Sequence, residues 1–345
     1  MFDIPIEILL SFVTAFIITF LAIPKIIFFA QKFRLYDSAG ARSSHIGKVP
    51  IFGGIAIFAG IIFSLLFWAE IEQIRFIIVS MFVVFFVGVI DDLLSLSPTK
   101  KVIGQIIAIL MIIYLHDLQI DNMHGVLGIY DLPDIVATLF TVFVVIVITN
   151  GFNLIDGVDG LAGSLGIVAS VSFGLLAIIS GQINMALIAF TLMGALLGFV
   201  LHNFHPAKIF MGDTGSLVVG LVLSILAINA INSGIISMHL PHKGPLVAIA
   251  ILAILLFDSL RVFIVRVVRG RNPLSPDMNH IHHALLNLGY GHQKTTLIIC
   301  IMNIFLIVVA FFLLEVNINI AITIFAAINF IFLYIPFLMK KKNND

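Results

Sequence analysis

Three short segments carry aspartates at spacings that suit a phosphate or metal site. In GVIDDLLSLSPTKKVIGQ, residues 88–105, Asp91 and Asp92 are adjacent and Lys101 follows them. Two neighbouring carboxylates that face a lysine can hold a divalent metal or a phosphate-bearing headgroup. The DDxxD pattern of soluble prenyl synthases fails at Ser95. A second interpretation, that the two aspartates only mark a membrane boundary, stays open for this segment.

The second segment is NGFNLIDGVDGLAG, residues 150–163, in which Asn153, Asp156 and Asp159 are three residues apart. On a helical turn, this spacing projects the three side chains into one broad sector. The four glycines of the segment permit close backbone approach. Because the candidate ligands are oxygen atoms and the chain has one cysteine, the segment suits Mg²⁺ rather than structural zinc. The alternative is a solvated turn.

The third segment is HPAKIFMGDTGSLVVG, residues 205–220, where a glycine turn carrying Asp213, Thr214 and Ser216 precedes an apolar run. A helix start with free backbone donors can bind a phosphate or a metal–phosphate complex. Lys208 adds a cation five residues upstream of Asp213. Alternatively, Asp213 or Thr214 caps the helix in the ordinary way.

Two further segments, residues 31–54 and 261–296, are rich in cations and histidines. Three histidines within four positions, without a cysteine cluster or an HExxH pattern, favour diphosphate or sugar binding over zinc chemistry. Basic loop residues can also act only as topology signals. The candidate substrate-binding residues of these two segments are His45, Lys48, Arg271, His280, His282 and His283.

The elements that must position these residues are membrane helices. The chain has 345 residues, of which 61% are hydrophobic and 10% charged, and its mean hydropathy is +1.20, which excludes a soluble domain. Its formal charge of zero predicts no nucleic-acid partner. Apolar runs predict an all-α, polytopic bundle of about eleven transmembrane helices in one domain, residues 1–345. The expected spans are 6–30, 51–69, 76–90, 102–115, 134–150, 161–179, 185–201, 215–232, 245–265, 295–314 and 317–338.

Basic residues are divided unevenly between the two sides that these spans define. Arg75 and Lys243 fall on one side, and the other lysines and arginines fall on or near the opposite side. By the positive-inside rule, the N-terminus is then outside and the C-terminus cytoplasmic. All the segments described above fall on the cytoplasmic side, where carboxylates at helix ends are candidates for function. We therefore expect one shared cytoplasmic site.

The motifs, in this order, resemble those of the polyprenyl-phosphate N-acetylhexosamine-1-phosphate transferases, the family of the WecA, TagO and MraY enzymes. The resemblance runs from about Arg42 to Lys294 through DD, NxxDGxDGLAG, FMGDTGS and HIHH. It implies ten or eleven membrane helices and a magnesium-dependent cytoplasmic site. HIGKVPIFGG and SPDMNHIHHALLNLGYGH look like the WecA and TagO branch, although Met278 stands where relatives often have a basic residue.

The resemblance implies transfer of an N-acetylhexosamine 1-phosphate, foremost N-acetylglucosamine 1-phosphate, from a UDP-sugar to undecaprenyl or another polyprenyl phosphate, with release of UMP. It places the protein in the bacterial inner membrane and leaves a homodimer open. Asp213 and Asn153 would bind Mg²⁺, and Lys101 would contact phosphate. The implied catalytic residues are Asp91, Asp92, Asp156, Asp159 and His283; His280, His282 and Arg271 would join His283 around the sugar and pyrophosphate.

Other functions remain as alternatives. An MraY-type enzyme would transfer phospho-N-acetylmuramoyl-pentapeptide instead. A secondary transporter would place its carboxylates near the bilayer midplane and show repeated halves. Asp258 is the one candidate for such a position, and its spacing from Arg261 favours an ion pair within a helix. An inactive protein that keeps the fold would lack a signature carboxylate, and none is missing.

Overall fold

A computed structural model describes residues 5–33, 49–233, 241–270 and 279–342. In this part of the chain the structure is helical, with one isolated β-bridge between Asn122 and Asp131. The predicted all-α class is confirmed. The elements are α1 Ile6–Lys32, α2 Gly53–Trp68, α3 Ile71–Leu94, α4 Pro98–His116, η1 Val126–Gly128, α5 Asp134–Ile155, α6 Leu161–Ile179, α7 Ile183–Asn203, α8 Gly212–Ser233, η3 Pro241–Lys243, α9 Gly244–Ile251, α10 Ala253–Val268, α11 Ile281–Asn287, α12 His292–Phe312 and α13 Ile318–Lys342.

Every predicted span coincides with a helix or a helix pair, but fewer are full spans than expected. Within the described residues, nine helices are long and apolar enough to cross a membrane. The helix α2 has only 16 residues. The predicted span at 245–265 is broken into α9 and α10, which differ in direction by 78°. The protein is thus a multi-pass membrane protein, and the part of the chain that the structure describes contains nine candidate spans, or ten if the broken pair is counted as one.

A side chain from α12 stabilises the break between α9 and α10. Asn303 Nδ2 donates to Ile251 O (3.0 Å), and Ile254 N donates to Asn303 Oδ1 (3.3 Å). Asn303 is itself buried. Broken helices persist at membrane depth only where protein groups satisfy the freed backbone donors and acceptors. The side-chain amide of Asn303 satisfies one freed acceptor and one freed donor, and it therefore stabilises the bend.

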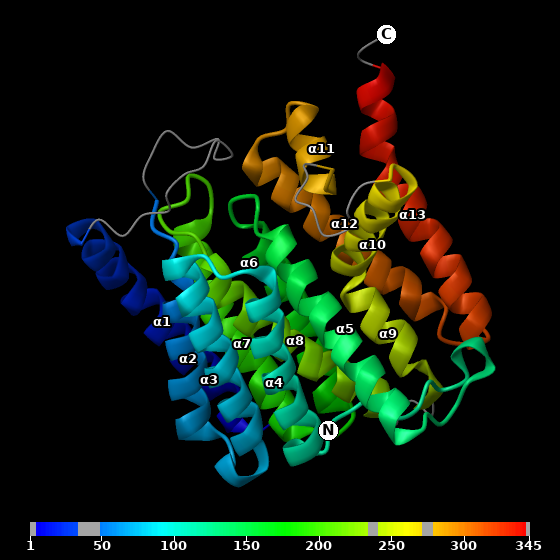
Figure 1. The fold of residues 1–345 in the computed structure, drawn as a ribbon, viewed down its shortest axis with the longest axis horizontal. Helices are drawn as coiled ribbons and strands as arrows, with labels where there is room; N and C mark the ends of the chain where they lie inside the picture. Colours follow the sequence, from blue (N-terminus) through cyan, green and yellow to red (C-terminus); the bar gives the residue numbers. More distant parts are fainter. Residues whose placement is uncertain (1–4, 34–48, 234–240, 271–278, 343–345) are drawn as a thin grey trace.

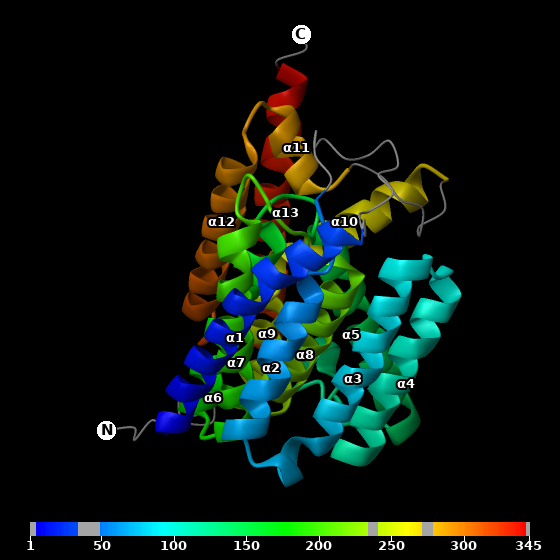
Figure 2. The same cartoon turned by 90° about the vertical axis from the view of Figure 1, so that its left-hand side faces the viewer.

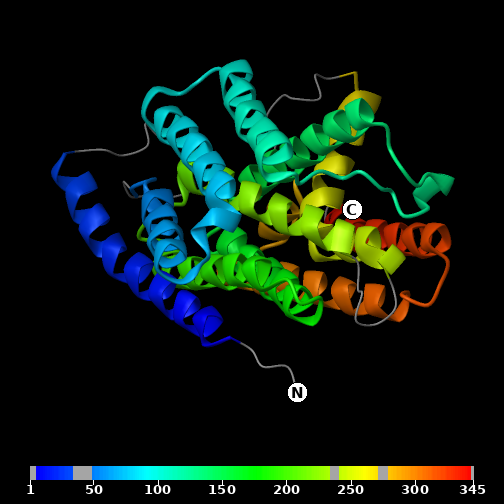
Figure 3. The same cartoon turned by 90° about the horizontal axis from the view of Figure 1, so that it is seen from below.

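The helix α8 lies near the middle of the bundle (Figure 3). Of its most apolar stretch, 89% is buried, as expected for a helix that is apolar on all sides. Its first turn packs closely against α2 and α3, because glycines face it from both helices. A Cβ atom on Gly54 would overlap the backbone of Gly215, and one on Gly88 would overlap Thr214. The start of α8 is therefore held in place from two sides.

The chain segments with the predicted motifs lie at one end of the bundle (Figures 1 and 2). The α3–α4, α5–α6 and α7–α8 connections and α11 are at the end from which α13 projects. The helix α1 begins at the opposite end, where the α4–α5 connection also lies. For the motif segments that the structure describes, the expected clustering at one end is confirmed. That this end faces the cytoplasm stays a prediction.

Candidate functional site

A lysine joins two carboxylates where α3 ends and α4 and α8 begin. Lys101 Nζ lies 3.0 Å from Asp91 Oδ2 and 2.7 Å from Asp213 Oδ1. Leu96 N donates to Asp91 Oδ1 (2.7 Å), which orders the turn between the helices. Pro98 begins α4 at a position where a missing N–H costs nothing, and this places Lys101 in the first turn. Residues from two segments that are far apart in the sequence thus meet, as the sequence predicted.

The neighbouring Asp92 caps the start of α8. Its Oδ1 accepts a hydrogen bond from Asp213 N (2.7 Å), and its Oδ2 accepts from Thr214 N (2.9 Å) and Thr214 Oγ1 (2.5 Å). These backbone donors have no partner within the helix. Gly212 precedes them with φ +70°, a conformation that favours glycine. The cap therefore comes from Asp92 on α3, and Thr214 donates to it rather than capping the helix.

Asn153, near the end of α5, contacts the same carboxylate as Lys101. Its Nδ2 donates to Asp213 Oδ1 and to Ser216 Oγ, the latter at 2.7 Å. The assignment of the two amide atoms follows from these contacts. It leaves the carbonyl oxygen of Asn153 as the candidate ligand for a cation. The predicted pairing of Asn153 with Asp213 is thus present as a direct contact.

Asp156 follows α5 and is partly buried. Burial, together with the charges of Asp213, Asp92 and Asp159, raises the pKa of Asp156 to about 8. The raised pKa reflects an excess of negative charge at this end of the bundle. A bound cation would reverse that effect.

The donor atoms of this cluster suit a hard divalent cation. Asp91, Asp156 and Asp213 supply carboxylate oxygens, and Asn153 adds a carbonyl oxygen. Within the described residues, Lys101 is the cation paired with Asp91 and Asp213. Mg²⁺ prefers oxygen ligands and is commonly held by one or two carboxylates together with substrate phosphates. The residues present therefore fit Mg²⁺.

Asp159 has a different environment from Asp156. Its buried carboxylate accepts from Ala207 N (3.2 Å) and contacts His205 Nδ1 (2.7 Å) and His292 Nδ1 (3.5 Å). Thr296 Oγ1 donates to its backbone oxygen. Asp159 therefore ties the α5–α6 loop to the α7–α8 loop and to the start of α12.

The two histidine partners of Asp159 were not among the predicted site residues. His205 and His292 lie far from Asp159 in the sequence, and neither belongs to a spacing pattern with it. Their ligand atoms and that of Asp159 lie within 4.8 Å of one another, close enough for a metal ion. However, Asp159 Oδ2 already contacts His205 Nδ1 and accepts from Ala207 N, and His292 Nδ1 accepts a hydrogen bond from Asp159 N (3.3 Å). These contacts hold the α5–α6 loop, the α7–α8 loop and the start of α12 together.

The histidine segment, which includes α11, contacts the α5–α6 loop. A Cβ atom on Gly157 would lie only 2.9 Å from His282 Nε2, so glycine at this position makes room for the imidazole. His282 is 1% exposed. Burial, aided by His283 and His280, lowers the pKa of His282 to about 3. The imidazole is therefore neutral at physiological pH and lies beside the loop that bears Asp156 and Asp159.

Within the described part of the chain, the other predicted site residues are not among the residues that contact Lys101 or Asp213. His280 points toward Asp258 on α10. The ring centroid of His283 lies 4.3 Å from that of His282, with an angle of 50° between the ring planes. Lys208 is exposed. His45, Lys48 and Arg271 lie outside the described residues. Asp258 and Arg261 form the predicted ion pair (2.8 Å).

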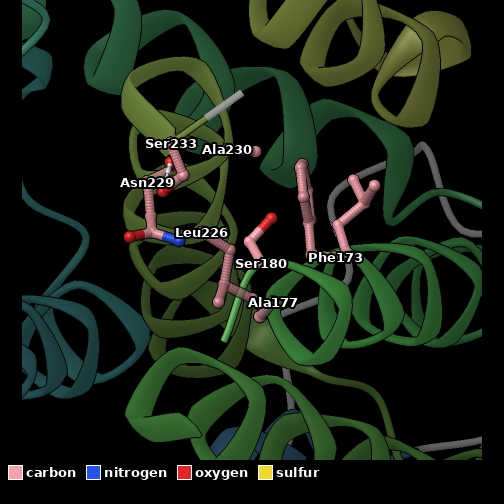
Figure 4. Close-up of a pocket in the computed structure, with 8 residues that line it drawn as sticks. Phe173, Ala177, Ser180, Leu226, Asn229, Ala230 and Ser233 are labelled. Atoms are coloured by element: carbon pink, nitrogen blue, oxygen red, sulfur yellow. Dashed lines mark hydrogen bonds between the residues drawn. The ribbon is translucent and has the colours of Figure 1, made fainter. Parts of the chain in front are cut away.

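A small cavity lies at the far end of α8 from this cluster (Figure 4). Its volume is about 10 Å³, room for one water molecule. It is lined by residues of α6 and α8, among them Asn229 and Ser233, and by Ser180, which follows α6. Its size and position separate it from the motif residues.

Comparisons with known proteins identify the family of this chain. Residues 74–231 match glycosyl transferase family 4, a range that includes the DD, NxxDGxDGLAG and FMGDTGS motifs. The chain is 36% identical over 299 residues to the undecaprenyl-phosphate alpha-N-acetylglucosaminyl 1-phosphate transferase of Pasteurella multocida, covering 84% of this chain and 82% of the relative. The chain belongs to this family of polyprenyl-phosphate N-acetylhexosamine-1-phosphate transferases.

Two further relatives of the family have similar names. The decaprenyl-phosphate N-acetylglucosaminephosphotransferase of Mycolicibacterium smegmatis is 32% identical, with 85% of this chain and 79% of the relative covered. The probable undecaprenyl-phosphate N-acetylglucosaminyl 1-phosphate transferase of Bacillus subtilis is 29% identical, with 85% and 81% covered. The family predicted from the motifs is confirmed. The histidine segment lies beyond the range of the family match, so its role depends on the geometry described above.

Proposed function

We propose that this protein transfers N-acetylglucosamine 1-phosphate from UDP-N-acetylglucosamine to undecaprenyl phosphate, or to a similar polyprenyl phosphate, and releases UMP. This would be the first lipid-linked step of an envelope polysaccharide. The observation that carries the proposal is the contact of Lys101, Asp91, Asp213 and Asn153 at one end of a multi-pass bundle. The names of relatives 29–36% identical over most of the chain support it.

The proposed site faces the cytoplasm of a bacterial inner membrane. A nucleotide sugar is water-soluble and is made in the cytoplasm, whereas a polyprenyl phosphate stays in the bilayer with its headgroup at the interface. The cluster lies at helix ends, where both can reach it. The uneven division of lysine and arginine supports the same orientation. A homodimer stays a prediction.

We propose Mg²⁺ as the cofactor, held by Asp213 and Asn153, with Asp156 and Asp91 as the other carboxylates near it. When bound, Mg²⁺ neutralises charge on the nucleotide diphosphate. The fit of the oxygen donors and the excess negative charge around Asp156 support this assignment.

The proposed reaction is a direct displacement at phosphorus. An oxygen of the lipid phosphate attacks the phosphorus that bears the sugar, a new P–O bond forms, and the bond to UMP breaks. Because all reacting groups are anions, catalysis depends on alignment and charge neutralisation. Lys101 stands at the centre of the cluster, where its ammonium can neutralise a phosphate oxygen. Asp92 holds the first turn of α8 and with it the carboxylate of Asp213.

Release of UMP by detergent-purified protein tests the proposal. With polyprenyl phosphate, Mg²⁺ and UDP-N-acetylglucosamine, we expect UMP release that needs all three components and stops with EDTA. Asp213→Asn should lower the rate by about 100-fold or more, because the carboxylate that contacts Lys101 and Asn153 loses its charge. Asp131→Asn is the matched control, since Asp131 lies in the loop at the opposite end.

The donor range of the same assay separates the alternatives. Release from UDP-N-acetylmuramoyl-pentapeptide but not from UDP-N-acetylglucosamine would favour the MraY-type reaction. Folded protein that releases no UMP from any UDP-sugar would contradict the proposed function.

A further inference from the structure

Asp258 on α10 is buried and accepts three hydrogen bonds outside the cluster described above. It is 1% exposed. Its Oδ2 contacts His280 Nδ1 (2.8 Å), and its Oδ1 accepts from Ile281 N (3.1 Å) and Arg261 Nη2 (2.8 Å). A carboxylate beside a guanidinium is an acceptor on both oxygens, so Nδ1 of His280 carries the hydrogen. Asp258 therefore holds both the side chain of His280 and the start of α11.

Arg261 extends this network in two directions. The guanidinium also donates to Asn279 O, immediately before His280. It lies over the ring of Phe337 on α13, 4.3 Å from the ring centroid. Arg261 is 5% exposed, and a cation over an aromatic face is attracted most strongly when it is removed from water. The backbone before α11 is thus fixed from α10, and α10 is fixed in turn against α13.

His280 connects this network to the α5–α6 loop through His282. The two rings are parallel, with an interplanar angle of 3° and centroids 5.6 Å apart. His282 Nε2 in turn lies against Gly157. The imidazole of His280 is hydrogen-bonded to Asp258, whereas that of His282 lies next to the loop that carries Asp156. The three histidines of the motif therefore have different surroundings.

We propose that Asp258 and His280 are positioning residues, which orient α11 so that His282 and His283 face the reaction site. Only the kinetic tests of this role depend on the proposed function. Asp258 reaches the histidine segment because α9 and α10 differ in direction by 78° at the break that Asn303 stabilises. A straight α9–α10 helix would carry Asp258 elsewhere.

The charge of Asp258 matters to this role. Removing one partner of a buried, hydrogen-bonded ion pair leaves the other charge uncompensated. Asp258→Asn would leave Arg261 without its counter-ion and would put an amide donor toward one of the three groups that donate to Asp258. The start of α11 would then shift, and a displacement of about 1 Å at a reaction site can cost about 100-fold in rate.

Kinetics of His280 variants test the proposal without disturbing the Asp258–Arg261 pair. In Asn, the amide nitrogen can take the place of imidazole Nδ1 and still donate to Asp258. We expect His280→Ala to lower kcat about 100-fold, with KM for UDP-N-acetylglucosamine little changed, and His280→Asn to recover kcat to within about fivefold of the wild type. An equal loss in both variants would overturn the proposal, because it would mean that His280 acts on substrate through Nε2.

A double-mutant cycle shows whether the two residues act through each other. Asp258→Asn combined with His280→Ala should reduce kcat no more than the worse single variant. Additive losses would contradict the proposal. Ser64→Ala is the matched control for the loss of a buried hydrogen bond elsewhere, since Ser64 Oγ donates to Ser11 O (2.7 Å) between α2 and α1. We expect that variant to keep its kcat.

Cysteine labelling provides a readout that does not depend on catalysis. Ala284 in α11 is buried, and Cys300→Ser removes the one native cysteine. In this background, Ala284→Cys should react with a maleimide about tenfold faster when His280→Ala is added, since a lost charge-assisted hydrogen bond destabilises the segment by about 1.4 kcal/mol. Unchanged labelling would overturn the positioning role. If the wild type released no UMP, the labelling result would still decide this proposal.

Discussion

Asp91 and Asp92 are adjacent in the sequence, yet they contact different partners. Asp91 shares Lys101 with Asp213, whereas Asp92 accepts three hydrogen bonds from the first residues of α8. The sequence predicted a catalytic role for both. For Asp92, the contacts are those of a helix cap, so its effect on the reaction would pass through the position of Asp213.

We therefore predict that Asp92→Ala lowers stability more than Asp91→Ala. Removal of an N-cap carboxylate typically costs about 1–2 kcal/mol of stability, and Asp92 is also the acceptor for Thr214 Oγ1. Thermal unfolding of the two purified variants in the same detergent, followed by tryptophan fluorescence, would measure the difference. Equal midpoints, or a lower midpoint for Asp91→Ala, would contradict the assignment of Asp92 as the cap.

At the scale of elements, glycines on α2 and α3 allow these helices to pack closely against the start of α8. Gly88 on α3 allows the helix to approach Thr214, and Gly54 on α2 allows the approach of Gly215. The same helix α3 supplies Asp91 and Asp92. A change in the α3–α8 distance would therefore alter the cap and the Lys101 contacts together.

Gly88→Ala tests this coupling. The added methyl group would meet Thr214 N at 2.8 Å and Asp213 O at 2.9 Å, both backbone atoms that cannot rotate away. We expect a loss of stability of about 1–3 kcal/mol and a fall in UMP release of about 100-fold. The control is Gly60→Ala on α2, which meets Ala15 O at 2.9 Å far from the site. Its stability should fall similarly while kcat is kept, and equal losses of kcat would contradict the coupling.

The helices were largely predictable from apolar runs, but their ends and breaks were not. The span expected at 76–90 extends over 71–94 in α3, because hydropathy falls at Glu72 and Asp91 while the helix continues. The break at Leu252 lies in an uninterrupted apolar run. It depends on the amide of Asn303, which comes from a helix about fifty residues later. A local pattern carries no sign of such a partner.

The partners of the site residues were likewise not predictable from local sequence patterns. The Asn153, Asp156, Asp159 spacing predicted one shared sector, yet the structure separates Asp159, which binds His205 and His292, from Asn153, which contacts Asp213. The residue types predicted the chemistry of the cluster. The pairing depends on which loops meet, and this follows from the packing of whole helices.

At the scale of the whole molecule, the two ends of the bundle differ in the kinds of residues that they carry. The motif segments share one end, and α1 begins at the other (Figure 2). The division of lysine and arginine predicts that the motif end is cytoplasmic. If the proposed function holds, this orientation decides which pool of nucleotide sugar the protein can use.

Cysteine scanning in spheroplasts would test the orientation. In a Cys300→Ser background, we expect Gln182→Cys, between α6 and α7, to react with a membrane-impermeant maleimide in intact spheroplasts. Ser97→Cys, between α3 and α4, should react only after permeabilisation. Both positions are exposed and lie at opposite ends. The reverse pattern would mean that the chain has the opposite topology and that the site faces outward.

The location of Asp91, Lys101 and Asp213 at the ends of apolar helices also affects how the two proposed substrates are supplied. A nucleotide sugar reaches helix ends by diffusion in three dimensions, at a rate set by its concentration in water. A polyprenyl phosphate is confined to a plane and encounters the same residues only by lateral diffusion. For the lipid, the relevant quantity is therefore its mole fraction in the bilayer or micelle. We therefore expect that diluting the acceptor with inert detergent at constant bulk concentration slows the reaction and leaves its dependence on nucleotide sugar unchanged.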